Sequence, residues 1–220
     1  MTDNYEQIAN ETRASGVTLV AVSKTRTPEE INVLYQKGQR DFGENRVQEL
    51  TAKAEELVED IRWHLIGHLQ KNKVKYIAPF VHLIHSVDSG DLLREINKRA
   101  AACGRVIPCL LQVHIAEEET KFGLSIDEVR EITEGPLLAE LPHVRIDGLM
   151  GMATLTEDEE QITKEFRSLK ELFDQLQQTV FSDSPHFSIL SMGMSSDYKM
   201  AIACGSNMIR VGTLLFGPRS

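Results

Sequence analysis

The chain has 220 residues, and its 24 Lys and Arg against 33 Asp and Glu give a formal net charge of −9. Hydrophobic residues make up 41% of the chain, enough apolar mass to bury a core, which excludes a collagen-like, low-complexity or disordered protein. The negative charge argues against a dedicated nucleic-acid-binding protein, because such proteins present a basic face. We expect one domain spanning residues 1–220, since α/β barrels of this size form a single unit.

The cysteines and the N-terminus predict the compartment. Cys103, Cys109 and Cys204 form neither a C-x-x-C pair nor a zinc-binding pattern, and their odd number is typical of reduced thiols. The N-terminus is acidic and polar, unlike a signal or transit peptide. No apolar run approaches the ~20 residues that a membrane span needs. The sequence therefore predicts a soluble, cytoplasmic protein that does not bind membranes.

Short apolar runs alternate with amphipathic helical patterns along the chain. A helix over about residues 5–13 comes first and precedes the first strand. The strands that we predict are Val17–Val22, Arg40–Phe42, Trp63–Ile66, Leu83–Val87, Ile107–His114, Arg145–Met150, Phe187–Leu190 and Met208–Val211. This alternation predicts parallel strands joined by crossover helices.

Several of the intervening helices have clear start and stop signals. Thr27 and Ser125 each begin a capping box, in which a hydroxyl is followed three residues later by a glutamate. Ser195 or Ser196 is predicted to start a later helix, and Gly205 is predicted to end it, as a C-terminal cap does.

Eight strand–helix units without a linker predict an α/β fold, the (β/α)8 or TIM barrel, over about residues 17–216 with one extra N-terminal helix. The alternative is an open, doubly wound sheet. No G-x-G-x-x-G follows a predicted strand and no Walker A motif is present, so the usual nucleotide signatures of that alternative are missing.

In a barrel of this type the active site lies at the carboxyl ends of the strands, and Lys24 follows the first one. A lysine at the barrel mouth is poorly hydrated, which lowers the pKa of its amine and makes it a nucleophile for an aldehyde or ketone. An equally simple interpretation is a lysine that leaves the strand into solvent.

The loops after the seventh and eighth strands both combine glycine with hydroxyl side chains, in residues 191–197 and 210–213. Barrels frequently bind phosphate between these two loops, although both could be simple turns. Arg210 lies in an apolar strand, where a guanidinium needs a partner. That partner is either a carboxylate across the barrel, such as Asp147 or Glu44, or an acceptor atom on a cofactor.

A nucleophilic lysine, a phosphate site and an arginine facing a ring acceptor together describe a pyridoxal 5′-phosphate (PLP) site. The chain resembles the pyridoxal phosphate homeostasis protein family, which is related to the barrel domain of alanine racemase, from about Val17 to Phe216. The segments that carry the resemblance are Ala21-Val22-Ser23-Lys24, Phe42-Gly43-Glu44-Asn45, Trp63–Gln70, His85-Ser86-Val87-Asp88, Gly148-Leu149-Met150, Ser191-Met192-Gly193-Met194-Ser195 and Arg210-Val211-Gly212-Thr213.

The resemblance implies a PLP-binding barrel of fold type III and a role for each matching residue. Lys24 would hold PLP covalently as a Schiff base, and Asn45 would lie beside the cofactor. The phosphate would be bound by Ser195, Gly212 and Thr213 together with backbone N–H groups near Met194. Arg210 would face the pyridine nitrogen and leave it unprotonated, because arginine offers no acceptor and stays charged. A weakened electron sink suits cofactor storage better than decarboxylation or transamination.

We therefore predict a non-enzymatic PLP carrier or regulator in PLP homeostasis, with no catalytic residues. A racemase would need a second acid–base group; alanine racemase takes a tyrosine from a second domain, which we expect this chain to lack, and only Tyr198 follows a strand end. The alternatives are a single-domain PLP-dependent amino-acid racemase and, third, a cofactor-free Schiff-base aldolase. PLP-dependent apoenzymes are the candidate partners, and a monomer is expected. A metal site is not predicted. His64 and His68 are four residues apart, but His64 lies in a predicted strand, where helical spacing does not apply, and His82 and His85 face opposite sides of a strand.

Overall fold

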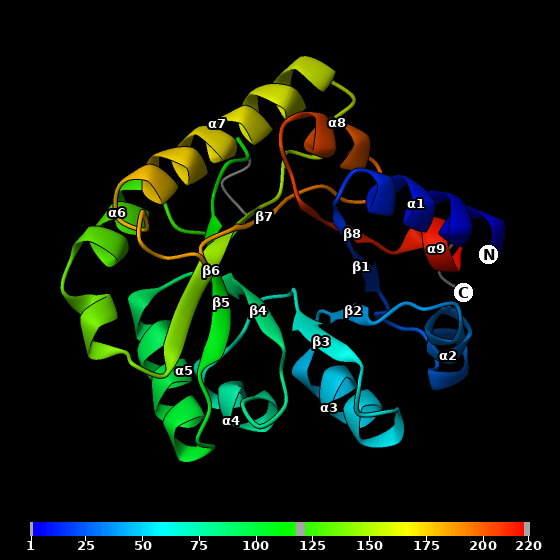
Figure 1. Cartoon of the computed structure of the whole chain (residues 1–220), viewed down its shortest axis with the longest axis horizontal. Helices are drawn as coiled ribbons and strands as arrows, with labels where there is room; N and C mark the ends of the chain where they lie inside the picture. Colours follow the sequence, from blue (N-terminus) through cyan, green and yellow to red (C-terminus); the bar gives the residue numbers. More distant parts are fainter. Residues whose placement is uncertain (1, 118–121, 218–220) are drawn as a thin grey trace.

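Eight parallel strands close into a barrel in which each strand pairs with the next along the chain and β8 pairs with β1 (Figure 1). The structure, a computed structural model, describes residues 2–117 and 122–217. The predicted (β/α)8 barrel is confirmed. The strands are β1 (Thr18–Val22), β2 (Asp41–Glu44), β3 (Arg62–Leu65), β4 (Leu83–Val87), β5 (Ile107–Val113), β6 (Val144–Gly151), β7 (Ile189–Ser191) and β8 (Met208–Val211).

Helices surround this ring of strands, and α7 is the longest of those described. The predicted extra helix is present as α1, which lies beside α9 (Figure 1). No helix in the described ranges is both long and apolar enough to span a bilayer. The helices are α1 (Thr2–Ala14), α2 (Pro28–Gln36), α3 (Val47–Glu56), α4 (Val74–Ile77), α5 (Gly90–Ala102), α6 (Ile126–Glu134), α7 (Glu159–Gln178), α8 (Tyr198–Ala203) and α9 (Thr213–Phe216), with two short 3-10 helices, η1 (Lys71–Lys73) and η2 (Leu137–Glu140).

The predicted helix signals act as expected except at α8. Thr27 and Ser125 form complete capping boxes at the starts of α2 and α6. Gly205 follows α8 with φ +95°, a conformation that glycine adopts without strain. The predicted start at Ser195 or Ser196 is wrong, because α8 begins at Tyr198. A turn comes first, closed by a hydrogen bond from the Met194 N–H to Asp197 Oδ1 (2.5 Å).

The barrel interior is separate from the larger core between strands and helices. Its apolar cluster takes residues from five different strands: Val20, Leu83, Leu110, Met150 and Met208. Parallel pairing places Val20 opposite Arg210, so both side chains face the interior. The interior is therefore only partly apolar.

Candidate functional site

Lys24 and Asn45 lie next to each other at the carboxyl ends of β1 and β2. The two strands pair Val22 with Gly43, and one further hydrogen bond joins the Ser23 N–H to the Gly43 carbonyl (3.0 Å). Lys24 and Asn45 come two residues after that pair and are both half-buried. The loop after β3 crosses Asn45 so closely that a Cβ on Gly67 would lie 2.4 Å from the Asn45 carbonyl oxygen. Only glycine fits at that crossing.

A buried ion pair holds the strand ends beneath Lys24. Glu44 Oε1 accepts hydrogen bonds from Ser23 Oγ (2.6 Å) and from Lys53 Nζ (2.7 Å), and Lys53 Nζ also donates to the Ser23 carbonyl (2.8 Å). Burial raises the pKa of Glu44 against the opposing effect of Lys53, and its second oxygen has no hydrogen-bond partner within the described residues. The residue before Lys24 is thus fixed from both its hydroxyl and its carbonyl.

The backbone turns sharply just after Lys24. Thr25 has φ +64°, a left-handed conformation that costs a branched residue about 1–2 kcal/mol. Its N–H donates to Glu49 Oε2 (2.9 Å), and Glu49 lies 3.5 Å from Lys53 Nζ. The same ion-pair cluster therefore also stabilises this strained turn.

The loops after β7 and β8 are bonded to each other. The Arg210 N–H donates to the Gly193 carbonyl (3.0 Å), and the Gly212 N–H donates to Ser195 Oγ (3.3 Å). Gly193 has φ +99°, and a Cβ there would lie 2.6 Å from the Ala201 Cβ. Because Asp197 accepts from the Met194 N–H, both predicted phosphate-binding N–H groups already have acceptors inside this loop pair.

The end of β8 also lies against the end of β1. A Cβ on Gly212 would stand 3.1 Å from the Val22 carbonyl oxygen, and Thr213 is the first residue of α9. Since β2, β1, β8 and β7 are consecutive around the closed ring, the structure brings all seven predicted site residues to one edge of the barrel. Their roles toward a ligand stay predictions.

Arg210 is buried and held from two sides. Its guanidinium donates to Ser191 Oγ (2.7 Å) and to the Gly151 carbonyl (3.0 Å). Burial lowers the pKa of Arg210 to about 10, and the charge of Asp197 opposes that shift. The predicted alternative of an ion pair with Asp147 or Glu44 is wrong, because these carboxylates bind other cations: Arg145 binds Asp147 and Lys53 binds Glu44.

The chain resembles known proteins over nearly all its length. The profile of the family described as "Alanine racemase, N-terminal domain" matches residues 1–220. The pyridoxal phosphate homeostasis protein of Aquifex aeolicus is 45% identical over 202 residues, which are 91% of this chain and 86% of that protein.

The chain belongs to the pyridoxal phosphate homeostasis protein family.

Two solved structures of PipY from Synechococcus elongatus PCC7942 share 38% sequence identity with this chain. The PLP-free structure has a TM-score of 0.89 and covers 98% of this chain and 99% of PipY. The structure with PLP bound has a TM-score of 0.85 and covers 97% of this chain and 100% of PipY. The resemblance seen in the sequence is therefore confirmed, and the relatives carry the name of a homeostasis protein, not that of an enzyme.

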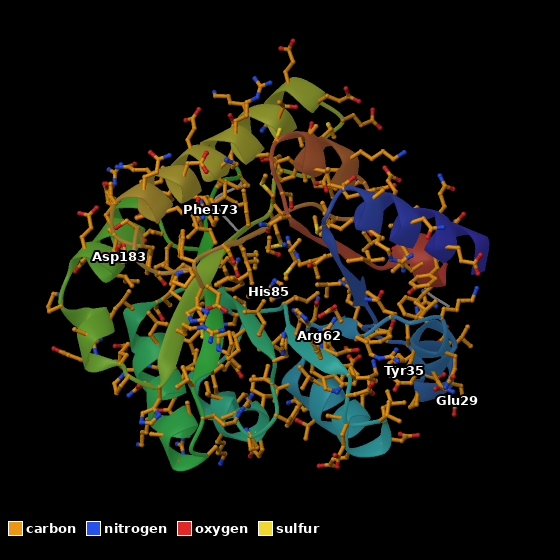
Figure 2. The ribbon with its side chains drawn as sticks, viewed as in Figure 1. Glu29, Tyr35, Arg62, His85, Phe173 and Asp183 are labelled. Atoms are coloured by element: carbon orange, nitrogen blue, oxygen red, sulfur yellow. The ribbon has the colours of Figure 1, made fainter. Side chains whose placement is uncertain are left out.

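Three side chains that support the site, Ser191, His85 and Lys53, were given no role of their own from the sequence. Ser191 and His85 hydrogen bond inside the barrel (3.1 Å), although they lie 106 residues apart, and His85 lies near the middle of the ring of strands (Figure 2). Lys53 was missed because it lies on a helix, where a lysine is usually exposed. The available signal for His85 was its place, with Ser86, inside a strand that is otherwise apolar, Leu83–Val87.

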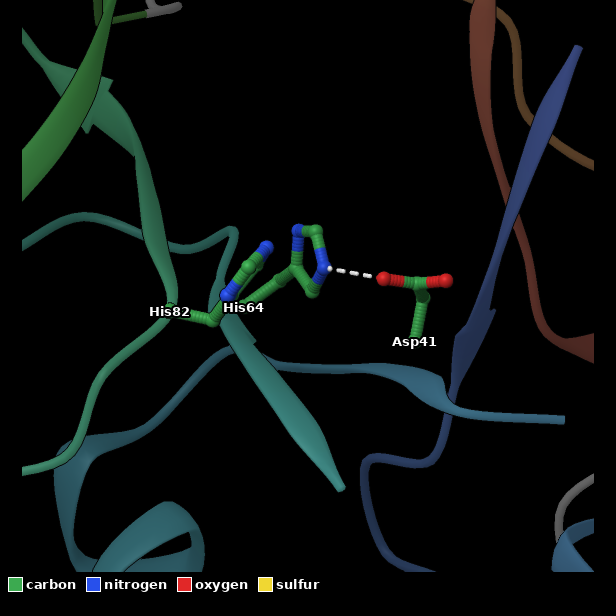
Figure 3. A group of neighbouring side chains, drawn as sticks. All are labelled: Asp41, His64 and His82. Carbon is green, nitrogen blue, oxygen red and sulfur yellow. Dashed lines mark hydrogen bonds and ion pairs between the residues drawn. The ribbon is translucent and has the colours of Figure 1, made fainter. Parts of the chain in front are cut away.

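Asp41, His64 and His82 form a cluster at the amino ends of β2 to β4 (Figure 3). Their ligand atoms lie within 4.8 Å of one another, a spacing that a metal ion could bridge. However, Arg62 already binds both oxygens of Asp41 (2.7 and 2.5 Å), and Asp41 accepts a hydrogen bond from His64 Nε2 (3.0 Å). A metal would displace both contacts, so we assign Asp41 and His64 to hydrogen bonding, with His82 packed against the His64 ring.

Proposed function

We propose that this protein binds PLP at the carboxyl edge of its barrel, as a Schiff base on Lys24, and acts as a carrier or regulator of PLP in the cytoplasm. The observation that supports this most strongly is the buried Arg210, anchored below the β7–β8 loops on the strand next to the one that Lys24 follows. PipY, at 38% identity, has a solved structure with PLP bound. We further propose a monomer that passes PLP to PLP-dependent apoenzymes.

The residues at this edge fit the cofactor's chemical groups. When bound, PLP supplies an aldehyde that traps an amine and a ring that withdraws electrons from it. Ser195, Gly212 and Thr213 offer hydroxyl and N–H donors for its phosphate. The Met194 N–H becomes available only when its bond to Asp197 is exchanged for one to the phosphate. Asp197 therefore competes for one of the phosphate donors.

The chemistry of Arg210, the residue that would face the pyridine nitrogen, favours cofactor storage over strong catalysis. Arg210 carries five N–H donors and no acceptor, and two of these donors go to Ser191 and Gly151. A further donor of Arg210 would face the pyridine nitrogen and, because arginine offers no acceptor, would leave that nitrogen unprotonated. Such a ring would withdraw electrons less strongly than one opposite a carboxylate.

The tyrosine nearest to the phosphate loops does not support racemisation. Tyr198 directs its hydroxyl to Glu11 in α1 (3.3 Å), outside the barrel. An acid–base partner for Lys24 would have to face the barrel mouth. Deuterium exchange at Cα of alanine tests this point, and exchange faster than with PLP alone would replace the carrier proposal with a racemase.

The covalent link is tested by loading the purified protein with PLP, reducing it with borohydride and locating the adduct by peptide mass spectrometry. We expect the phosphopyridoxyl group on Lys24 and none on Lys53, a neighbouring lysine engaged by Glu44, which serves as the internal control. Lys24→Arg keeps the positive charge but loses the adduct. An adduct on another lysine would overturn the assignment. If adding PLP caused no absorbance change, the cofactor-free aldolase would replace the PLP-binding proposal.

Arg210→Ala tests the ring-nitrogen contact. We expect about tenfold weaker PLP binding, the equivalent of losing one charged hydrogen bond, and a shifted absorption maximum of the bound cofactor. Circular dichroism serves as the folding control. An unchanged affinity and spectrum would make Arg210 a structural residue.

A further inference from the structure

A continuous chain of hydrogen bonds crosses the barrel interior below Arg210. Ser191 Oγ, which accepts from Arg210 (2.7 Å), lies 3.1 Å from His85 Nδ1. His85 Nε2 lies 2.8 Å from His64 Nδ1, and His64 Nε2 lies 3.0 Å from Asp41 Oδ1. All five residues are buried. The chain links the site edge with the cluster of Figure 3 at the amino end.

The side chains come from β8, β7, β4, β3 and β2, so the chain passes across the barrel and not around it. Apolar side chains such as Leu110 and Met150 fill the rest of the interior. A buried polar group without a partner costs about 1–3 kcal/mol in such surroundings, so each side chain depends on the next.

The two ends favour one direction for the hydrogens. Arg210 can only donate, so Ser191 Oγ accepts from it and keeps its own hydrogen available for His85 Nδ1. Burial lowers the pKa of His85 well below its usual value, so His85 is neutral and carries its single hydrogen on Nε2. That hydrogen is donated to His64 Nδ1, and the His64 Nε2–H is donated to Asp41. Every donor thus points from Arg210 toward Asp41.

Asp41 is a suitable acceptor for the end of this chain. Burial by itself would raise the pKa of Asp41, but hydrogen bonds from Arg62 and His64 lower it far below its usual range. The carboxylate therefore stays charged, and Arg62 holds it by both oxygens. The chain runs from a buried cation to an anchored anion.

We propose that Asp41, His64 and His85 are positioning residues that act through Ser191 to orient the Arg210 guanidinium toward the ring of the bound cofactor. The effect of these residues on PLP binding rests on the proposed function, since it requires Arg210 to face PLP. The hydrogen-bond direction itself does not depend on any cofactor.

The barrel contains a matched control for Asp41. Asp147 is also buried and also binds an arginine with both oxygens, Arg145 (2.6 and 2.8 Å). Unlike those of Asp41, the side-chain hydrogen bonds of Asp147 within the described ranges go to Arg145 and not to the hydrogen-bond chain. A charge-removing Asp→Asn change at either position breaks an arginine–carboxylate pair, but only the change at Asp41 reaches Arg210.

The direction of the chain is tested in the PLP-free protein by long-range proton–nitrogen NMR of ¹⁵N-histidine-labelled samples. Signals are assigned with His64→Gln and His85→Gln. We expect both histidines to be neutral with hydrogen on Nε2. Hydrogen on Nδ1 of His85, or a doubly protonated His64, would overturn the one-way chain. This measurement needs neither PLP nor a variant of Ser191.

The effect on the site is tested by PLP titration and by the absorption maximum of the bound cofactor. We expect Ser191→Ala to weaken PLP binding about tenfold, Asp41→Asn about threefold and Asp147→Asn not at all. Ser191→Ala and Asp41→Asn should both shift the absorption maximum in the same direction as Arg210→Ala does. Equal effects of Asp41→Asn and Asp147→Asn, or an unshifted maximum in both chain variants, would overturn the proposal.

The two proposals fail in different ways. If the wild-type protein does not bind PLP, the proposed function fails, and the NMR result still decides the chain. If the wild-type protein binds PLP on Lys24 while Ser191→Ala and Asp41→Asn behave like wild type, the function holds and the positioning role fails.

Discussion

The two sides of the candidate site are held in place by different kinds of interaction. On the Lys24 side, the buried charges of Glu44 and Lys53 fix the ends of β1 and β2. On the Arg210 side, the guanidinium donates to Ser191 and to a backbone carbonyl, and a chain of hydrogen bonds continues from Ser191 through His85 and His64. A direct ion pair therefore holds one side, and directional hydrogen bonds hold the other.

This difference predicts how substitutions on each side affect the protein. A buried ion pair is costly to desolvate and leaves a strongly destabilising charge when one partner is removed. A neutral hydrogen-bond chain loses less energy per broken link, but its loss changes the orientation of the group at its end. We expect variants on the Lys24 side to affect stability first and variants on the Arg210 side to affect the ligand first.

The largest loss of stability is expected for Lys53→Met. It removes the cation that lies 2.7 Å from the buried Glu44 and should lower the free energy of unfolding by about 3 kcal/mol. Lys170→Met is the matched control, because Lys170 pairs with Asp174 one helical turn away on a partly exposed face, where such pairs contribute about 0.5 kcal/mol or less. Urea denaturation measures both.

The double variant Glu44→Gln/Lys53→Met separates charge from packing. Since it removes both charges, it should recover more than half of the loss caused by Lys53→Met. A double variant as unstable as the single one would show that the Lys53 stem, and not its charge, stabilises the strand ends.

Gly193→Ala tests the backbone on the Arg210 side. Gly193 has φ +99°, and its new Cβ would lie 2.6 Å from the Ala201 Cβ, so we expect a loss of about 2 kcal/mol and weaker PLP binding. Gly38→Ala is the control, because Gly38 has φ +98° with nothing within 4 Å of the added Cβ and should cost about 1 kcal/mol. Equal losses would mean that the β7–β8 loop adjusts to the extra methyl group.

The sequence predicts the barrel well because the signals for its strands and helices come from residues that are close together along the chain. Strand alternation and capping residues such as Thr27 lie within a few neighbours of the structure that they determine. Lys24 and Arg210 could be found because they end or interrupt apolar strands.

The supporting residues could not be found in this way. The Ser191–His85 contact joins residues 106 positions apart, and no local pattern encodes it. The start of α8 was misplaced because residues 195–197 form a turn, closed by the bond from the Met194 N–H to Asp197, before the helix begins at Tyr198. The first depends on closure of the barrel, and the second on a local turn that competes with the serine caps.

The smallest expected effect is a difference in pH dependence between two carboxylates three residues apart on β2. Hydrogen bonds from Arg62 and His64 outweigh burial and lower the pKa of Asp41, so its contribution to stability is complete above the unfolded pKa of about 4 and is lost as the pH falls further. Burial raises the pKa of Glu44, so its contribution is complete below the unfolded pKa of about 4.3 and declines as the pH rises through the native pKa.

Asp41→Asn and Glu44→Gln should therefore change the pH profile of stability in opposite directions. Relative to wild type, Asp41→Asn should be least stable at neutral pH and should approach wild type as the pH falls below about 4. The stability of Glu44→Gln relative to wild type should be highest at neutral pH and lowest at low pH. At low pH the wild-type carboxyl is protonated and no longer carries a buried charge, so wild type gains stability that the variant does not. Urea midpoints at several pH values between about 3 and 7 measure both profiles. Parallel profiles for the two variants would mean that Glu44 and Asp41 are held alike, which would remove the contrast between the two sides of the site.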